Sequence, residues 1–211
     1  MSELDFAALL CSRLCHDLVS PVGAINNGLE ILEEEKDASM REAVVDLITK
    51  STQQTANKLQ FFRLAFGAAG GFSSKLDTRE AEKAIVALLS GSRVSLDWHV
   101  SVPSVSKSFV KLLLNVALVA SESLIRGGVL AISLGNEDDQ YQLEIEARGE
   151  RIILQEAVKF ALLGQVAEDD LEPRTAPAHL AAILARELGG RLEIEQDEGK
   201  FVVKALVSSN N

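Results

Sequence analysis

The stretch Cys15-His16-Asp17-Leu18-Val19-Ser20-Pro21 lies early in a long helical pattern whose register can be read on both sides of it. Apolar residues recur there at steps of three, four and seven, which is one stripe of an α-helix. At about 100° per residue, His16 points roughly 160° away from the centre of this stripe, toward solvent. The pattern predicts a helix from about Leu4 to Glu35. The stripe consists of Phe6, Leu10, Leu14, Leu18, Ile25, Leu29 and Leu32.

The side chains that share the outward face with His16 are small or uncharged. All of them lie within about 60° of His16 on the helical wheel. A face that only meets solvent more often carries Lys and Glu, and Glu30 and Glu34 restore that pattern further along. The arrangement predicts a low surface beside the imidazole. Its members are Ser12, Val19, Ser20, Gly23 and Asn27.

The chemistry that suits an exposed imidazole on such a surface is phosphoryl transfer. A neutral imidazole nitrogen is a good nucleophile near pH 7, and the neighbouring Asp17 can accept a proton or orient the ring. Pro21 has no N–H to give the carbonyl of Asp17, so we expect the helix to bend or loosen just after His16. Taken alone, His16 is more simply explained as one surface histidine on a helix.

Composition sets limits on the class of protein. The 211 residues can hold one large or two small domains, and 47% of them are hydrophobic, which is enough for a full core. The net charge is −10 without a cluster of Lys or Arg, which argues against nucleic acid or an anionic membrane as direct partner. We see no signal peptide and no apolar run near the ~20 residues of a membrane span. We therefore expect a cytoplasmic protein.

The two cysteines, Cys11 and Cys15, are four residues apart on the first predicted helix. Together with His16 they suggest a metal site, but the spacing is not that of a zinc module and no second pair of ligands exists. We expect a reduced, partly buried pair and no bound metal.

A second long helix follows after a tight turn at residues 37–39. Ser39 is its predicted N-cap, with Glu42 completing a capping box, and the helix runs from Met40 to about Phe66. Two long helices joined by a short turn form an antiparallel hairpin, which cannot bury two apolar stripes well by itself. Pairing with a second copy as a dimeric four-helix bundle solves this problem. The alternative is packing against the rest of its own chain.

A Gly- and Ser-rich segment at residues 67–74 marks a boundary between a hairpin domain, 1–70, and a second domain, 75–211. Asp77 and Glu80 open another helix that ends near Gly91. Two hairpins are predicted, with turns at residues 136–139 and 197–199. This mixture of helices and antiparallel strands indicates an α/β sandwich, and the fold class as a whole is α+β. Its further predicted strands cover 93–101, 129–134, 141–147, 191–196 and 201–206, and its helices 106–125, 153–163 and 176–188.

The pattern His-Asp-Leu-x-x-Pro resembles the phosphoacceptor box of two-component histidine kinases. Together with the following Val22-Gly23-Ala24-Ile25-Asn26-Asn27-Gly28-Leu29-Glu30, it resembles more specifically the ChpT-type histidine phosphotransferases of alphaproteobacteria. The order of elements after residue 75, with Leu188-Gly189-Gly190-Arg191-Leu192-Glu193-Ile194, is similar to the ATP-binding domain of histidine kinases, the GHKL or Bergerat fold.

The resemblance also shows which nucleotide-binding residues are replaced. Asn115 matches the first asparagine of the kinase helix, whereas Val119 stands at the Mg²⁺-binding asparagine and Glu122 at the lysine. Val119 offers no hard oxygen ligand for Mg²⁺. In the adenine-reading turn, Ala147 replaces the aspartate and Arg151 the second glycine, and of that motif Gly149 alone remains, within Ala147-Arg148-Gly149-Glu150-Arg151.

The stretch before the last helix, Glu172-Pro173-Arg174-Thr175-Ala176-Pro177-Ala178-His179, lacks the glycines that wrap a triphosphate in the kinases. We therefore expect an ATPase-like fold without an ATPase site, which binds no cofactor. Two other histidines need an interpretation. His99 is expected to be structural, and His179 is a weaker candidate for a partner surface.

The resemblance implies a dimeric histidine phosphotransferase that relays a phosphoryl group between receiver-domain aspartates. His16 is the phosphoacceptor and Asp17 its catalytic neighbour. The donor is the receiver of a hybrid kinase of the CckA type, the acceptors are regulators of the CtrA and CpdR types in cell-cycle signalling, and the receiver carries the Mg²⁺. The first helix of the receiver is expected to dock on the hairpin. The residues assigned to partner binding are Ser12, Arg13, Val19, Ser20, Pro21, Gly23 and Asn27.

Two alternatives belong to other classes. One is a divergent ATP-dependent histidine kinase, which requires nucleotide binding. The other is a non-catalytic module that sequesters a regulator, for which His16 is dispensable.

Overall fold

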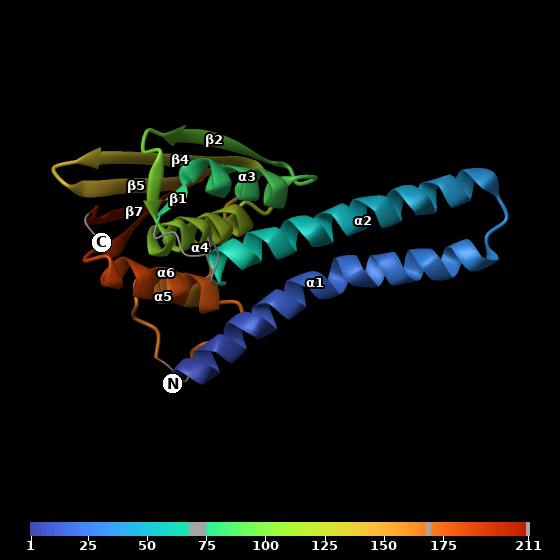
Figure 1. The fold of residues 1–211 in the computed structure, drawn as a ribbon, viewed down its shortest axis with the longest axis horizontal. Coiled ribbons are helices and arrows are strands. Elements are labelled where there is room, and N and C mark those ends of the chain that lie inside the picture. The colour runs from blue at the N-terminus through green and yellow to red at the C-terminus, as the bar shows by residue number, and fades with distance from the viewer. Residues whose placement is uncertain (68–74, 168–169, 210–211) are drawn as a thin grey trace.

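The N-terminal part of the protein is an antiparallel helical hairpin made of α1 (Glu3–Glu34) and α2 (Ala38–Ala65). The computed structural model describes residues 1–67, 75–167 and 170–209. Figure 1 shows the turn of the hairpin at the far end of a long arm that projects from the rest of the molecule. Both helices predicted from the apolar periodicity are therefore confirmed.

The caps of the hairpin helices differ in part from expectation. Ser2 caps α1 and forms a capping box with Asp5. The cap of α2 is Asp37, whose carboxylate accepts from the N–H of Met40, so the prediction of Ser39 was wrong. An ionised carboxylate at a helix N-terminus interacts favourably with the helix dipole, and this allows the helix to begin at Ala38.

The second part of the chain is built on one mixed sheet. Within the described residues its strand order is β2-β4-β5-β7-β6, in which β2 (Val94–Val100) pairs parallel to β4 (Gly128–Glu137). The remaining neighbours are antiparallel: β4 with β5 (Gln140–Arg148), β5 with β7 (Lys200–Ser208), and β7 with β6 (Arg191–Asp197). Both predicted hairpins are confirmed. The short strands β1 (Lys75–Asp77) and β3 (Ser104–Ser106), which pair antiparallel, were not predicted.

Helices cover one face of this sheet (Figure 1). They are α3 (Thr78–Leu89), α4 (Lys107–Ser123), α5 (Glu156–Leu162) and α6 (Ala176–Glu187). The helix α4 is buried almost all round, because it lies between the sheet, α6 and the end of α2. The expected start of α3 after Asp77 is confirmed, whereas α5 is shorter than the predicted 153–163.

The core of the second part extends into the end of the hairpin. Phe61, Phe62, Leu64 and Ala65 at the C-terminal end of α2 are buried in the same apolar cluster as α4 and the sheet. Most of the predicted linker, residues 68–74, lies outside the described residues. The hairpin is thus anchored at one end, and the position of α1 relative to the sheet follows from this anchor.

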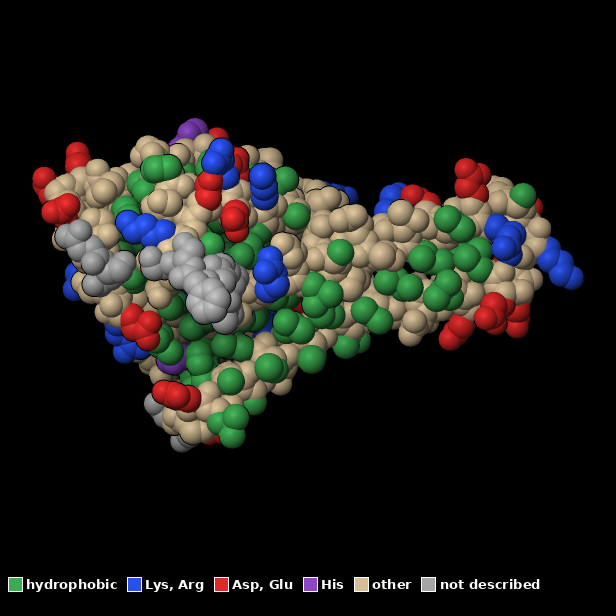
Figure 2. Space-filling model, in the orientation of Figure 1, with side chains coloured by type: hydrophobic (Ala, Val, Ile, Leu, Met, Phe, Trp, Pro, Cys, Tyr) green, Lys and Arg blue, Asp and Glu red, His purple; other side chains and the backbone are tan. Residues whose placement is uncertain are grey.

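The projecting half of the hairpin leaves apolar side chains uncovered. Leu29, for example, keeps 50% of its surface exposed although it belongs to the predicted stripe. Figure 2 shows hydrophobic side chains gathered along one flank of the arm, beyond the reach of the sheet domain. The alternative that the chain covers both stripes itself therefore fails for this half. The exposed apolar residues of this half include Val19, Val22, Leu29, Ile31, Val45 and Leu47.

Two further expectations about α1 need correction. Cys11 and Cys15 are free and exposed rather than partly buried. In the described chain, α1 is the one helix long and apolar enough to cross a membrane, by length and composition alone. Part-buried hydrogen bonds tie it to other helices: Arg13 donates to Glu122 on α4, and the Asp17 carbonyl accepts from Lys58 on α2, which identifies α1 as part of the folded domain.

Candidate functional site

His16 lies on the outward face of α1, as the helical wheel predicts. Its side chain is 85% exposed, and its Nδ1 lies 3.3 Å from Oδ1 of Asp17. The carboxylate of Asp17 is only 16% exposed, because it points from the helix toward the second part of the chain. The imidazole of His16 is therefore accessible from solvent, whereas the Asp17 carboxylate is held inside.

The contact with Asp17 decides which nitrogen of His16 is free to react. An ionised carboxylate can only accept hydrogen bonds, so this contact is a hydrogen bond in the tautomer in which Nδ1 carries the proton and donates to Oδ1. The other nitrogen, Nε2, then keeps its lone pair and faces solvent. This is the nitrogen that can attack an electrophile.

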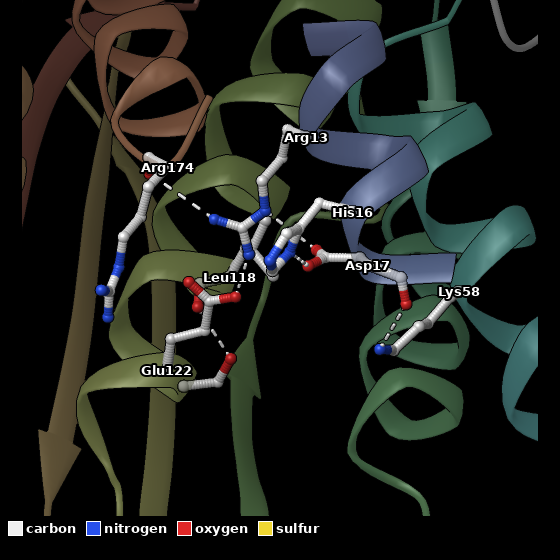
Figure 3. Close-up of polar contacts among 8 residues, drawn as sticks. Arg13, His16, Asp17, Lys58, Leu118, Glu122 and Arg174 are labelled. Carbon is white, nitrogen blue, oxygen red and sulfur yellow. Dashed lines mark hydrogen bonds and ion pairs between the residues drawn. The ribbon is translucent and has the colours of Figure 1, made fainter. Parts of the chain in front are cut away.

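Asp17 is held from its other side by Arg13, one helical turn earlier (Figure 3). The Nε of Arg13 donates to Oδ2 of Asp17 at 2.9 Å, its Nη2 donates to Oε1 of Glu122 on α4, and its Nη1 lies 3.5 Å from the carbonyl of Arg174. Burial by itself lowers the pKa of Arg13, but Glu122 and Asp17 outweigh this effect and raise it. Arg13 is therefore a permanent buried cation between two carboxylates.

The backbone of Asp17 is held as well. Pro21 lies inside α1 and has no N–H to offer the Asp17 carbonyl, so that acceptor lacks its partner within the helix. The Nζ of Lys58 on α2 donates to it at 2.9 Å (Figure 3). The axis of α1 is visibly bent in Figure 1, as expected for a helix that contains a proline.

A cavity of about 710 Å3 opens beside His16. It brings together three separate parts of the chain: one face of α1, the end of α4 and the segment just before α6. The charged groups around it belong to both signs, so it is not a simple anion site. Its lining residues are Ser12, Arg13, His16, Asp17, Glu122, Glu172, Pro173 and Arg174.

The residues assigned to partner binding divide into two groups. Ser12, Val19, Ser20 and Asn27 are exposed, and a side chain added at Gly23 would meet nothing within 4 Å, so the surface near His16 is low. Arg13 and Pro21 are buried, so their side chains add little to the surface that is open to a partner. Arg13 is 5% exposed because its guanidinium is drawn inward by Glu122 and Asp17.

The positions that the kinase resemblance compares with nucleotide-binding residues make packing contacts in this chain. Asn115 is fully buried, and its Nδ2 donates to the carbonyls of Ala65 and Lys111, which ties the end of α2 to α4. Val119 is buried in the apolar core. At Gly149, an added Cβ would lie 2.8 Å from the carbonyl oxygen of Gly127, so the turn is closed by its own backbone.

The other two histidines, His179 and His99, lie away from His16 and make contacts of their own. The ring of His179 packs edge-on against Phe6 of α1, with 5.4 Å between the ring centroids. Burial, and then Arg186, lower its pKa, and its buried Nδ1 has no partner in the described chain. His99 is exposed on β2, where its Nε2 lies 2.8 Å from Oδ1 of Asp97. Neither ring lines the cavity beside His16.

Sequence reasoning missed three parts of this site. The pair Arg13 and Asp17 has the i, i+4 spacing of a helical ion pair, and this signal was available in the sequence. Glu122 and Lys58 come from distant segments, and no local pattern points to them.

Comparison with known proteins places the chain in a family of phosphotransferases. Residues 78–200 match the model of the histidine phosphotransferase C-terminal domain. The chain is 36% identical over 207 residues to the protein phosphotransferase ChpT of Brucella abortus (strain 2308), with 97% of each chain covered. Its fold matches the solved structure of a bacterial phosphotransferase with a TM-score of 0.87 and 34% identity over 97% of both chains. The chain therefore belongs to the histidine phosphotransferase family.

Proposed function

We propose that this protein relays a phosphoryl group between receiver-domain aspartates of a phosphorelay, with His16 as the phosphoacceptor. The observation that carries the proposal is the contrast between an exposed His16 ring and a largely buried, fixed Asp17 carboxylate. The ring of His16 is 85% exposed, whereas Asp17 is 16% exposed and is fixed by Arg13 and Lys58. A nucleophile that must meet a protein substrate needs such exposure, together with a neighbour that holds the ring in one tautomer.

The reaction is a reversible transfer between a carboxylate and an imidazole. The Nε2 lone pair attacks the phosphorus of an aspartyl phosphate, the N–P bond forms, and the P–O bond breaks as the receiver's carboxylate leaves. Positive charge then develops on the ring, where Asp17 lies beside Nδ1 and stabilises it. A second receiver takes the group by the reverse steps. The Mg²⁺ is bound by the receiver.

The second copy of this chain is proposed to pair along α1 and α2 in a four-helix bundle. The support is the apolar surface of the projecting arm, which no part of the described chain covers. The partners proposed from the family resemblance are the receiver of a CckA-like hybrid kinase and CtrA-like and CpdR-like regulators, all in the cytoplasm. A receiver on the hairpin would lie on the low surface around Gly23 and reach His16.

Autokinase activity is not part of this proposal. In this chain the amide of Asn115 binds main-chain carbonyls, Val119 is apolar and buried, and Glu122 contacts Arg13. These contacts support the proposal that the residues at the kinase nucleotide-binding positions pack the fold in this chain and bind no nucleotide. Micromolar binding of ATP with Mg²⁺, measured by calorimetry, would favour the kinase reading instead.

The test is to mix the protein with a receiver that carries a radiolabelled aspartyl phosphate. We expect label on this chain that is labile in acid and stable in base, in a peptide that contains His16. The matched variant His16→Ala should take no label and melt like the wild type, because an outward side chain leaves no cavity when it is truncated. Equal labelling of His16→Ala would place the phosphoacceptor elsewhere.

A further inference from the structure

The carboxylate of Asp17 is shared between two neighbours. Its Oδ1 faces Nδ1 of His16 at 3.3 Å, and its Oδ2 accepts from Nε of Arg13 at 2.9 Å. An arginine beside a carboxylate commonly takes both oxygens in a bidentate pair. In the described chain, Arg13 reaches Asp17 through Nε alone. Something therefore restrains the guanidinium.

The restraint comes from α4. The Nη2 of Arg13 is engaged by Glu122, and its Nη1 points to the carbonyl of Arg174 (Figure 3). The planar fork of an arginine is rigid, so fixing two of its corners also fixes the direction of Nε. With Nη2 turned toward Glu122 on α4, Nε is the nitrogen that donates to Asp17. Its Oδ1 stays available to His16.

We propose that Glu122 is a positioning residue for the phosphoacceptor: by holding Arg13 it keeps Asp17 Oδ1 on His16 and thereby keeps Nε2 free to react. The second part of the chain thus takes part in the transfer without touching the phosphoryl group. This inference rests on the proposed function only for its kinetic consequence, since the contact itself exists in the unphosphorylated protein.

The proposal predicts the result of neutralising Glu122. In Glu122→Gln the guanidinium loses its carboxylate on α4 and turns onto both oxygens of Asp17. Oδ1 is drawn away from His16, and the ring shifts from the Nδ1–H tautomer to the Nε2–H tautomer, whose Nε2 has no lone pair for the attack. The side chain of Glu122 is 44% exposed, so the substitution leaves the fold intact.

The first measurement is the tautomer of His16, read from its two ring 15N chemical shifts in the unphosphorylated protein at a pH where the ring is neutral. We expect predominantly Nδ1–H in the wild type and mainly Nε2–H in Glu122→Gln. This readout needs no receiver, and a purely structural role of Glu122 would not move it. The matched control is Glu150→Gln, which removes a carboxylate from the exposed Arg126–Glu150 pair of the same domain and should leave the tautomer unchanged.

The second measurement is the rate of transfer from a phosphorylated receiver. We expect kcat to fall about tenfold in Glu122→Gln with KM unchanged, because the reacting ring is misplaced while the docking surface is intact. Arg13→Gln should lower kcat at least as much. The double variant should be no worse than Arg13→Gln alone, since Glu122 acts through Arg13.

An unchanged tautomer in Glu122→Gln would overturn the inference, as would a rise in KM with normal kcat, which would make Glu122 a receiver contact. Additive losses in the double variant would also contradict it. If the wild type takes no label from any receiver, the proposed function fails, while the tautomer result still decides the role of Glu122.

Discussion

The bond from Lys58 to the carbonyl of Asp17 gives a stability prediction that depends on Pro21. The Nζ of Lys58 replaces the N–H that Pro21 lacks, at 2.9 Å and in a partly buried place. A hydrogen bond to a charged group contributes about 1.5–3 kcal/mol, and its loss leaves the acceptor unsatisfied. We therefore expect Lys58→Met to lower the free energy of unfolding by about 1.5 kcal/mol.

The same substitution should cost little once the proline is removed. In Pro21→Ala the alanine N–H can donate to the Asp17 carbonyl, so Lys58 is no longer needed there. We expect Lys58→Met to cost less than about 0.5 kcal/mol in that background, which makes the two sites strongly coupled. Urea unfolding of all four proteins at one fixed protomer concentration measures this, because an oligomer's stability depends on concentration.

The matched control is Lys50→Met, which breaks an exposed i, i+4 pair with Asp46 on the same helix. Surface pairs of this kind contribute at most about 0.5 kcal/mol, and the loss should be equal with or without Pro21. If Lys58→Met costs the same in both backgrounds, Lys58 does not substitute for the missing N–H.

Three further outcomes are expected. Gly23→Arg, about 10 Å from His16 along α1 at ~1.5 Å per residue, should reduce transfer steeply, whereas Glu34→Arg, about 27 Å away, should reduce it little; equal losses would move the docking surface elsewhere. Leu29→Glu should give monomers in light scattering, because it places a charge in the apolar face that the second copy covers in the proposed dimer. An unchanged oligomer would contradict the proposed bundle. Burial lowers the pKa of His179 in the folded protein below its ordinary value of 6.5, so as the pH falls the unfolded chain takes up a proton on this ring before the folded chain does. The free energy of unfolding should therefore decrease as the pH falls below about 6.5. The variant His179→Gln should show less of this loss in urea unfolding at different pH values, and an identical pH profile would contradict it.

The sequence predicted the structure well where the periodicity of apolar residues determines a helix or strand locally. The apolar steps around His16 placed α1 and the outward direction of the imidazole, a second apolar stripe after the tight turn placed α2, and the alternation across residues 136–139 placed a strand hairpin. Pro21 pointed to the unsatisfied carbonyl of Asp17. Each of these inferences uses neighbours within one or two turns, where geometry follows from spacing alone.

The remaining parts of the site depend on tertiary contacts. Arg13 and Glu122 are separated by 109 residues, and only the tertiary fold, in which α1 packs against α2 and α6, brings them together. Lys58 meets Asp17 because the bent α1 and α2 lie side by side. The cap at Ser39 was wrong because Asp37 offers a charged alternative two residues earlier. Such competition between nearby caps is settled by the whole turn and not by one motif.

The central claim is that His16 carries the phosphoryl group between two receivers, and one experiment tests it most directly. A receiver with a radiolabelled aspartyl phosphate is mixed with a second, unlabelled receiver, and this protein is added in catalytic amount. We expect label to reach the second receiver rapidly with the wild type and not with His16→Ala. Transfer at equal rates with both proteins, or no transfer with the wild type between any pair of receivers, would contradict it.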